Sequence, residues 1–277
     1  VVCWNAMMTT LVQTGDFRDA LNRFYKMEYM GIKLSNISFL CALDACNGLI
    51  SLEDGQQIHG AIAKRGRIHD IMVASALINM YGKCGSLSDA KKIFENIPRK
   101  DAISCTSMVV ALTENQLHEE ALNQFSDMLC NGINPDTITF VCILNACACL
   151  TAVEVGFIIH AAVVEMKLEQ DTLIGTGIMD VYGKGGTKED ASKVFSTLTC
   201  CDIGMWNAML SVYAHNGNEN EIKRLFKQFE MNMAKPSCIT FISMLVAFDH
   251  AGMVDDGWYF FHYMRNKYDF LPESEHY

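Results

Sequence analysis

In this chain of 277 residues, the 12 cysteines and 8 histidines are the side chains that could bind a metal, form a disulfide or act in catalysis. No two cysteines stand at the C-x-x-C spacing of a zinc site, and the closer groups Cys147-Ala148-Cys149 and Cys200-Cys201 do not supply it. Cys41 returns 101 positions later as Cys142, which is typical of a packing residue in a repeat. The sequence therefore predicts small buried cysteines in a reducing compartment, with no disulfide framework and no metal.

His118-Glu119-Glu120 is the one stretch that resembles a catalytic motif. It fits H-x-E, the half-motif in which zinc deaminases place a metal ligand and a proton-transferring glutamate, but the partner P-C-x-x-C is absent. Acidic residues are also favoured at a helix N-terminus, where this stretch is expected to lie. Neither a glycine-rich phosphate loop nor a plausible catalytic triad is found. We expect no catalytic residue, no cofactor and no small-molecule substrate.

The elements that carry these residues repeat at a fixed separation of 101 positions. Tyr81-Gly82-Lys83 returns as Tyr182-Gly183-Lys184, and His59 returns as His160. Further series at this separation are Met7, Met108 and Met209; Phe24, Phe125 and Phe226; Phe39, Phe140 and Phe241; and Gly55, Gly156 and Gly257. A separation held over many residues marks a repeat array. Sub-units of 35, 35 and 31 residues fill each round, which places the repeats at 1–35, 36–70, 71–101, 102–136, 137–171, 172–202, 203–237 and 238–273, with a partial repeat at 274–277.

Each repeat has the pattern of two helices joined by a turn. In the first copy Trp4, Met8 and Leu11 form one apolar stripe, and Gly15 suits a left-handed helix end. A lone hairpin cannot bury both of its faces, so the hairpins must stack. The predicted fold class is all-α, an α-solenoid of stacked helical hairpins.

Two local expectations accompany this fold. Gly55 stands where other copies have alanine, which predicts a close approach of two helices. Ser86-Leu87-Ser88-Asp89 has a hydroxyl followed three residues later by a carboxylate, which predicts a capping box at a helix start.

Composition and charge limit the function classes. Half of the residues are hydrophobic and 19% are charged, which predicts a continuous core rather than disorder. The formal net charge is −10, and no lysine or arginine stands between Lys100 and Lys167, which counts against attachment to nucleic acid by bulk positive charge. The apolar run from Ile138 to Val153 is too short for a membrane span, so we expect no membrane contact. Any targeting segment is expected upstream of Val1.

The repeat lengths and several motifs resemble those of the pentatricopeptide repeat family. The motifs are VVCWNAMMTTLVQTGDFRDALNRFYKMEYMGIKLS, ISFLCALDACNGLISLEDGQQIHGAIAKRG and ALINMYGKCGSLSDAKKIFENIPRKD. The alternation of 35, 35 and 31 residues resembles the plant PLS class, whose long, short and standard repeats alternate, and the resemblance covers essentially the whole chain. It implies a right-handed superhelix that binds single-stranded RNA at about one base per repeat. It also implies location in the mitochondrion or chloroplast and a role in C-to-U editing or other RNA maturation, with other RNA-editing proteins as candidate partners. In editing members carboxy-terminal extensions follow the array, and some of them carry a zinc deaminase.

The family also implies which residues read the base, namely the fifth and the last residue of a repeat. The matching pairs here are Asn5 with Ser35, Ser75 with Asp101, Thr106 with Asp136, Thr176 with Asp202, and Asn207 with Ser237. In the family Thr or Ser with Asp favours guanine and Asn with Ser favours cytosine, which gives 5′-C-N-G-G-N-G-C-3′. The long repeats carry Leu40, Val141 and Ile242 at the fifth position, which cannot hydrogen-bond a base. The alternative for each polar residue is a helix cap or a turn former.

The second residue of a repeat is expected to flank the base. The matching residues are Val2, Ile37, Met72, Ile103, Ile138, Leu173 and Ile239, whereas Gly204 departs from the pattern. Ordinary hydrophobic residues at a helix start are the alternative.

Lys83 and Lys184, near the end of the first helix of each short repeat, are candidates for phosphate contact. The alternative is a lysine favoured by the helix dipole. The standard repeats have Gln13, Glu114 and His215 at the matching place, and Glu114 would repel phosphate. A protein-binding scaffold without RNA readout is the second function class, and the negative charge favours it.

Overall fold

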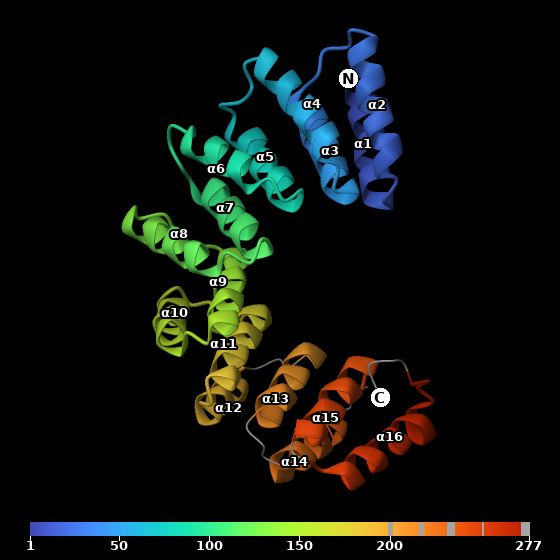
Figure 1. The fold of residues 1–277 in the computed structure, drawn as a ribbon, viewed down its shortest axis with the longest axis vertical. Helices are drawn as coiled ribbons and strands as arrows, with labels where there is room; N and C mark the ends of the chain where they lie inside the picture. Colours follow the sequence, from blue (N-terminus) through green and yellow to red (C-terminus); the bar gives the residue numbers. More distant parts are fainter. Residues whose placement is uncertain (199–201, 216–218, 232–235, 251, 273–277) are drawn as a thin grey trace. The chain divides into compact units, whose positions relative to one another are not determined.

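The structure, a computed structural model, describes residues 1–198, 202–215, 219–231, 236–250 and 252–272. Every regular element in these ranges is a helix (Figure 1). The helices are α1 (Val2–Thr14), α2 (Phe17–Tyr29), α3 (Asn36–Leu49), α4 (Leu52–Lys64), α5 (Ile71–Lys83), α6 (Leu87–Glu95), α7 (Ala102–Glu114), α8 (His118–Cys130), α9 (Thr137–Leu150), α10 (Val153–Glu165), α11 (Thr172–Lys184), α12 (Lys188–Thr197), α13 (Ile203–His215), α14 (Glu219–Met231), α15 (Cys238–His250) and α16 (Val254–Tyr268). The predicted fold class is confirmed. The repeat bounds stay a prediction, and the partial repeat at 274–277 lies outside the described residues.

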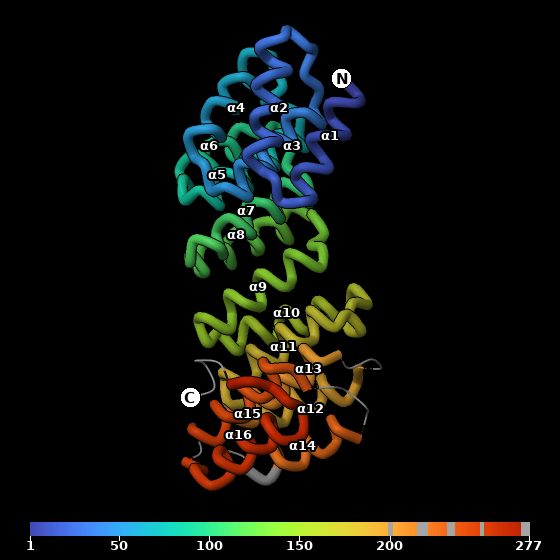
Figure 2. The backbone as a smooth tube through the Cα atoms, turned by 90° about the vertical axis from the view of Figure 1, so that its right-hand side faces the viewer, coloured from blue at the N-terminus to red at the C-terminus, as the bar shows by residue number. Residues whose placement is uncertain are grey.

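The chain forms two compact units, Val1–Ile143 and Leu144–Tyr277. Within the first unit the leading helices of successive hairpins pack on one another in the order α1, α3, α5 and α7. Within the second unit α11, α13 and α15 do the same. The second helix of a hairpin packs on its own leading helix, as in α1–α2, α5–α6 and α11–α12 (Figure 2). Each unit is therefore a layer of leading helices backed by a layer of second helices. The handedness of the superhelix stays a prediction.

One pair of aromatic rings recurs at the junction between successive repeats. Phe24 of α2 meets Phe39 of α3, with ring centroids 5.8 Å apart. The pairs Phe125–Phe140 and Phe226–Phe241 repeat this contact, each at 6.0 Å. All six side chains are buried. The phenylalanine series at a separation of 101 is thus a core contact that joins the second helix of one repeat to the leading helix of the next.

Glycines at two recurring positions allow helices to approach closely. A Cβ atom on Gly55 of α4 would lie 2.3 Å from the sulfur of Met80, so the close approach expected from the sequence is present. A Cβ atom on Gly82 of α5 would lie 2.6 Å from the Cβ of Ala111 and 3.0 Å from its Cα. Because the second contact includes backbone, α5 and α7 can pack this closely only with glycine at residue 82.

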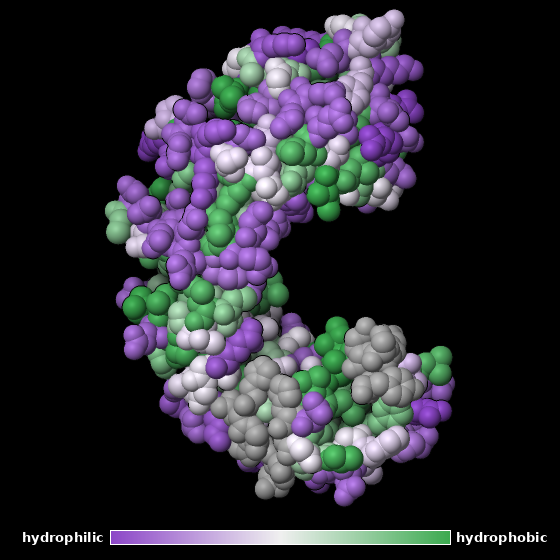
Figure 3. All heavy atoms as spheres, in the orientation of Figure 1, coloured by the Kyte–Doolittle hydropathy of each residue, from purple (hydrophilic) through white to green (hydrophobic). Residues whose placement is uncertain are grey.

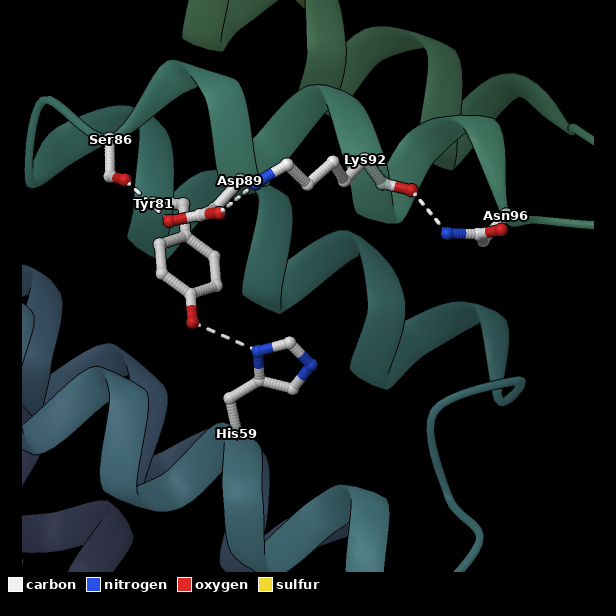
Figure 4. A network of polar contacts seen from close by, with 6 residues as sticks. All are labelled: His59, Tyr81, Ser86, Asp89, Lys92 and Asn96. Atoms are coloured by element: carbon white, nitrogen blue, oxygen red, sulfur yellow. Dashed lines mark hydrogen bonds and ion pairs between the residues drawn. The ribbon is translucent and has the colours of Figure 1, made fainter.

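Polar contacts between the second and third repeats explain a recurring histidine (Figure 4). Nδ1 of His59 lies 2.9 Å from the hydroxyl of Tyr81, and the equivalent His160–Tyr182 distance is 2.8 Å.

The hydroxyl of Ser86 donates to the carboxylate of Asp89 at 2.8 Å and makes no side-chain bond to a helix N–H. The expected capping box is therefore wrong: the two side chains that would have formed it are bonded to each other.

The described cysteines divide into buried, half-buried and exposed groups, and the half-buried ones are Cys84, Cys142 and Cys238. Cys41, Cys46, Cys105 and Cys147 are buried as expected, and burial raises the pKa of the Cys46 thiol to about 12. The expectation is wrong for the exposed residues Cys3, Cys130 and Cys149. Cys200 and Cys201 lie outside the described residues. Across the described ranges, no helix combines the length and apolar character needed to cross a membrane.

Candidate nucleic-acid interface

The last residue of each repeat begins the leading helix of the next one. Ser35 is the N-cap of α3, and Asp101 is the N-cap of α7, each in a reciprocal capping box. Asp136, Asp202 and Ser237 accept hydrogen bonds from the backbone N–H three residues later, at 2.8, 2.9 and 3.3 Å. The capping alternative is therefore correct for these five residues. A cap fixes the position of a polar side chain without using all of its hydrogen-bonding capacity.

The fifth residue of a repeat lies one turn inside the leading helix and is not a cap. In two repeats it reaches the last residue across the interface between hairpins. The side-chain nitrogen of Asn5 donates to the hydroxyl of Ser35 at 2.9 Å. The hydroxyl of Thr106 lies 3.5 Å from the Asp136 carboxylate. Asn5 and Thr106 are each 7% exposed, so only a small part of each residue can be reached from solvent.

In the other three repeats, the described residues form no hydrogen bond between the fifth and last side chains. The buried hydroxyl of Ser75 has no hydrogen-bond partner. Thr176 donates to the backbone carbonyl of Thr172, in its own helix, at 2.8 Å. The side-chain oxygen of Asn207 is also without a partner. Buried polar atoms without partners are costly, so Ser75 and Asn207 each leave one side-chain oxygen unsatisfied inside the protein.

The second residue of the repeats is an exposed apolar side chain in both units. The seven residues predicted to flank a base are exposed by between 46% (Ile103) and 82% (Val2). A second and a fifth residue are three positions apart, which places them on neighbouring turns of one helix face. Gly204 has no side chain to offer, and its neighbour Ile203 is exposed by 39%. Each unit therefore presents apolar surface beside the polar residues at the helix starts.

The two lysines predicted to contact phosphate have different surroundings. Lys83 is exposed at the end of α5 and forms no hydrogen bond or ion pair with a described residue. Lys184, at the end of α11, forms an ion pair of 2.9 Å with Asp180, one turn earlier. The residue that corresponds to Asp180 in the first short repeat is Asn79, which carries no charge. Gln13 and Glu114 are exposed at the matching place of the standard repeats, and the side chain of His215 lies outside the described residues.

The H-x-E stretch lies at the first turn of α8, as expected. Nε2 of His118 is 3.3 Å from the side-chain oxygen of Gln116. Among the residues that the structure describes, no three His, Cys, Asp or Glu side chains are grouped so that they could hold a metal ion. Glu119 and Glu120 lie in the first turn of α8, where acidic side chains are favoured.

Sequence reasoning missed two buried hydroxyls next to the pairs predicted to read a base. Ser38 donates to the side-chain oxygen of Asn5 at 2.7 Å, and the hydroxyl of Thr139 lies 2.7 Å from that of Thr106. Both residues are fully buried. The signal was present in the sequence, because Ser38, Thr139 and Thr240 form a hydroxyl series at a separation of 101.

Comparison with known proteins identifies the repeats. Models described as PPR repeat, PPR repeat family and Pentatricopeptide repeat domain match residues 2–32 and 73–101, 100–149, and 200–250, respectively. The chain belongs to the pentatricopeptide repeat family. A pentatricopeptide repeat-containing protein of Arabidopsis thaliana is 35% identical over all of the chain, which covers 28% of that protein. Two other such proteins of A. thaliana, one named chloroplastic and one mitochondrial, are 33% and 31% identical over 99% and 100% of the chain, which covers 51% and 43% of them.

The fold of this pentatricopeptide repeat array is that of a solved relative. The protein PPR10, crystallised in complex with an 18-nucleotide psaJ RNA element, matches 98% of the chain with a TM-score of 0.82 and 16% identity. The chain covers 41% of PPR10 and about a quarter to a half of the curated relatives named above.

Proposed function

We propose that this array binds single-stranded RNA in a sequence-specific way and serves organelle RNA maturation. The observation that carries the proposal is the repeated pairing of an exposed apolar second residue with a polar fifth residue beside a polar helix cap. Apolar side chains hold the faces of an unstacked base, while a few polar atoms meet its Watson–Crick edge. This arrangement occurs at intervals along both units, as a reader of successive bases requires.

The finer assignment is that the chain is the targeting array of a C-to-U editing factor of the PLS class. The alternation of repeats of 35, 35 and 31 residues supports it. PPR10 was crystallised with RNA, and relatives carry chloroplastic and mitochondrial names, which supports an organelle as the site of action. In this proposal the array determines which site on the transcript is bound. Base-changing chemistry and other RNA-editing proteins act from outside it.

The proposed base order is 5′-C-N-G-G-N-G-C-3′, and a binding selection tests it. The 277-residue chain is offered single-stranded RNA with seven randomised positions, and the bound pool is sequenced. The variant Thr106→Asn leaves Asp136 in place and is expected to move the fourth letter from G toward U, while the other letters stay. A pool without letter preference would contradict the proposed function, and a fourth letter that stays G would remove this pair from the readout.

A protein-binding scaffold remains the second candidate because one helix favours it. The outer face of α10 is apolar, with Phe157, Ile158 and Val164 exposed, whereas the equivalent positions of α4 are Gln56, Gln57 and Ala63 (Figure 3). An array that serves only as a scaffold would bind the predicted RNA no better than a shuffled one. The same selection therefore separates the two functions.

A further inference from the structure

A chain of hydroxyl groups joins two successive repeats at Thr106. Thr139, the third residue of the following repeat, donates its hydroxyl proton to the Asp136 carboxylate at 2.7 Å, and its backbone N–H donates to the same oxygen at 2.8 Å. The hydroxyl oxygens of Thr139 and Thr106 lie 2.7 Å apart. Because a hydroxyl has one proton and that of Thr139 is given to Asp136, Thr106 must be the donor in this last bond.

This arrangement fixes what Thr106 can offer to a base. Its proton is used inside the protein, so only its lone pairs remain for a ligand. The second oxygen of the Asp136 carboxylate receives no hydrogen bond from a described residue and is also an acceptor. Guanine presents two adjacent N–H donors, at N1 and N2, whereas adenine presents one donor beside the acceptor N1. A site with acceptors only therefore selects guanine against adenine.

Ser38 holds Asn5 in a corresponding way. The hydroxyl of Ser38 donates to the amide oxygen of Asn5 at 2.7 Å, and the amide nitrogen donates to Ser35 at 2.9 Å. These two bonds fix the orientation of the amide and leave one N–H of Asn5 for a ligand. Such a donor suits N3 of cytosine, which is an acceptor, and opposes N3 of uracil, which carries a hydrogen.

We propose that Ser38 and Thr139, the third residues of the following repeats, are positioning residues that set the donor and acceptor pattern of the fifth residue. The base choice of one repeat then depends on a buried hydroxyl contributed by the next repeat. The inference rests on the proposed function, because it deepens the readout by Asn5 and Thr106.

The same chain contains two contrasting repeats. Thr176 and Asp202 are the same pair of residue types as Thr106 and Asp136, but the third residue that follows is Met205. Without that hydroxyl, Thr176 bonds to its own helix at the carbonyl of Thr172. Ser104 has a hydroxyl and bonds to Asp101 at 2.9 Å, but it makes no bond to Ser75. A third-position hydroxyl can therefore cap a helix without engaging the fifth residue.

Three substitutions test the inference in the binding selection on the 277-residue chain. Thr139→Val removes the hydroxyl but keeps the branched shape, and it is expected to lower the ratio of G to A at the fourth letter about fivefold. Ser38→Ala is expected to lower the ratio of C to U at the first letter by a similar factor. Ser104→Ala is the matched control, since it removes a capping hydroxyl of the same kind and should leave the third letter unchanged.

The unfolding temperature of each variant measures the stability that is lost with the capping hydroxyl. The control Ser104→Ala loses such a hydroxyl too. Thr139→Ser keeps the hydroxyl, so it should retain the ratio of G to A. This variant replaces Thr139→Val if Thr139→Val does not fold. A lost preference for G in Thr139→Ser would then overturn the inference. An unchanged fourth letter in Thr139→Val, or an equal change in Ser104→Ala, would overturn the inference while the proposed function stands. A wild-type chain with no letter preference would overturn both.

Discussion

At the scale of single residues, the polar side chains at the repeat boundaries cap helices at the positions that we propose to read bases. Asp101 caps α7 through the backbone N–H of Ser104, and it is also the last residue of a repeat whose fifth residue is Ser75. A capping carboxylate is held in place by the helix it starts, and its second oxygen can still accept a hydrogen bond. Capping thus supplies the rigidity that a base-reading group needs, at positions where the fold already requires a polar residue.

The two candidate phosphate lysines are predicted to contribute unequally. Lys184 forms an ion pair with Asp180 on its own helix, whereas Lys83 forms no ion pair with a described residue and has only the longer-range attraction of Asp44 on α3. Lys83→Gln should weaken binding to all RNA sequences alike and lower the salt slope by about 0.7, while Lys184→Gln should have a smaller effect. Asp180→Asn should strengthen binding by releasing Lys184. Fluorescence titrations at several salt concentrations measure all three, and a change in base preference in any of them would contradict the phosphate assignment.

Stability is predicted to fall as pH falls below about 6.5 because of the two His–Tyr pairs. Burial lowers the pKa of His59 and His160 from the ordinary value of 6.5, although Asp89 and Asp190 act in the opposite direction. The unfolded chain therefore takes up protons at a higher pH than the folded chain, so stability is full above pH 6.5 and decreases below it. Unfolding temperatures between pH 7.5 and 5.5 measure the effect. The double variant His59→Gln/His160→Gln should show a flatter dependence, and an unaltered slope would exclude these residues as its cause.

At the scale of elements, the leading helices set how closely the repeats can stack. The contact of α5 with α7 depends on Gly82, whereas Gly60 of α4 has no atom within 4 Å of the place where its Cβ would stand. Two glycines in neighbouring helices thus have opposite roles. The first allows packing, and the second only weakens its helix.

Alanine at these two glycines is predicted to change stability in opposite directions. Gly82→Ala forces a Cβ against the backbone of Ala111 and should lower the free energy of unfolding by about 1–3 kcal/mol. Gly60→Ala meets no neighbour and should raise it by up to about 1 kcal/mol. Urea unfolding at one temperature compares the two variants with the parent chain. Stabilisation by Gly82→Ala would show that α5 and α7 can separate at little cost.

At the scale of the whole molecule, the charge balance limits how the array can hold RNA. The chain carries 22 basic and 32 acidic residues, and none of the basic residues falls between Lys100 and Lys167. We therefore expect weak electrostatic attraction to phosphate, so that the proposed RNA binding comes mainly from base contacts.

Binding of RNA is accordingly predicted to be weak and only mildly salt-dependent. Two phosphate contacts on a single strand correspond to a slope of log K against log salt of about −1.4. The slope is measured with the predicted seven-base RNA and a shuffled control. The salt concentration is varied over about a sixfold range, from about 50 to about 300 mM. A steep slope with equal affinity for both RNAs would mean non-specific attraction through phosphates.

The sequence alone determined the hairpins, their order and much of their core. The separation of 101 placed Phe24, Phe125 and Phe226 at the same junction, and all three are buried there. The resemblance to the repeat family picked out the second residues, such as Ile37, whose exposure follows from their place at a helix start. These features are predictable because helical periodicity and repeat position decide, within one hairpin or its neighbour, which face is buried.

Only the tertiary structure decided which polar side chains meet. Thr106 and Thr176 occupy the fifth position before an aspartate that ends the repeat, yet Thr106 bonds across the interface to Thr139 and Thr176 bonds to its own helix. The expected box at Ser86 failed at short range, because its hydroxyl donates to the Asp89 carboxylate three residues later and makes no bond to a helix N–H. A hydrogen bond forms or fails within a few tenths of an ångström, and that distance is set by how two helices pack, not by the residue types at their ends.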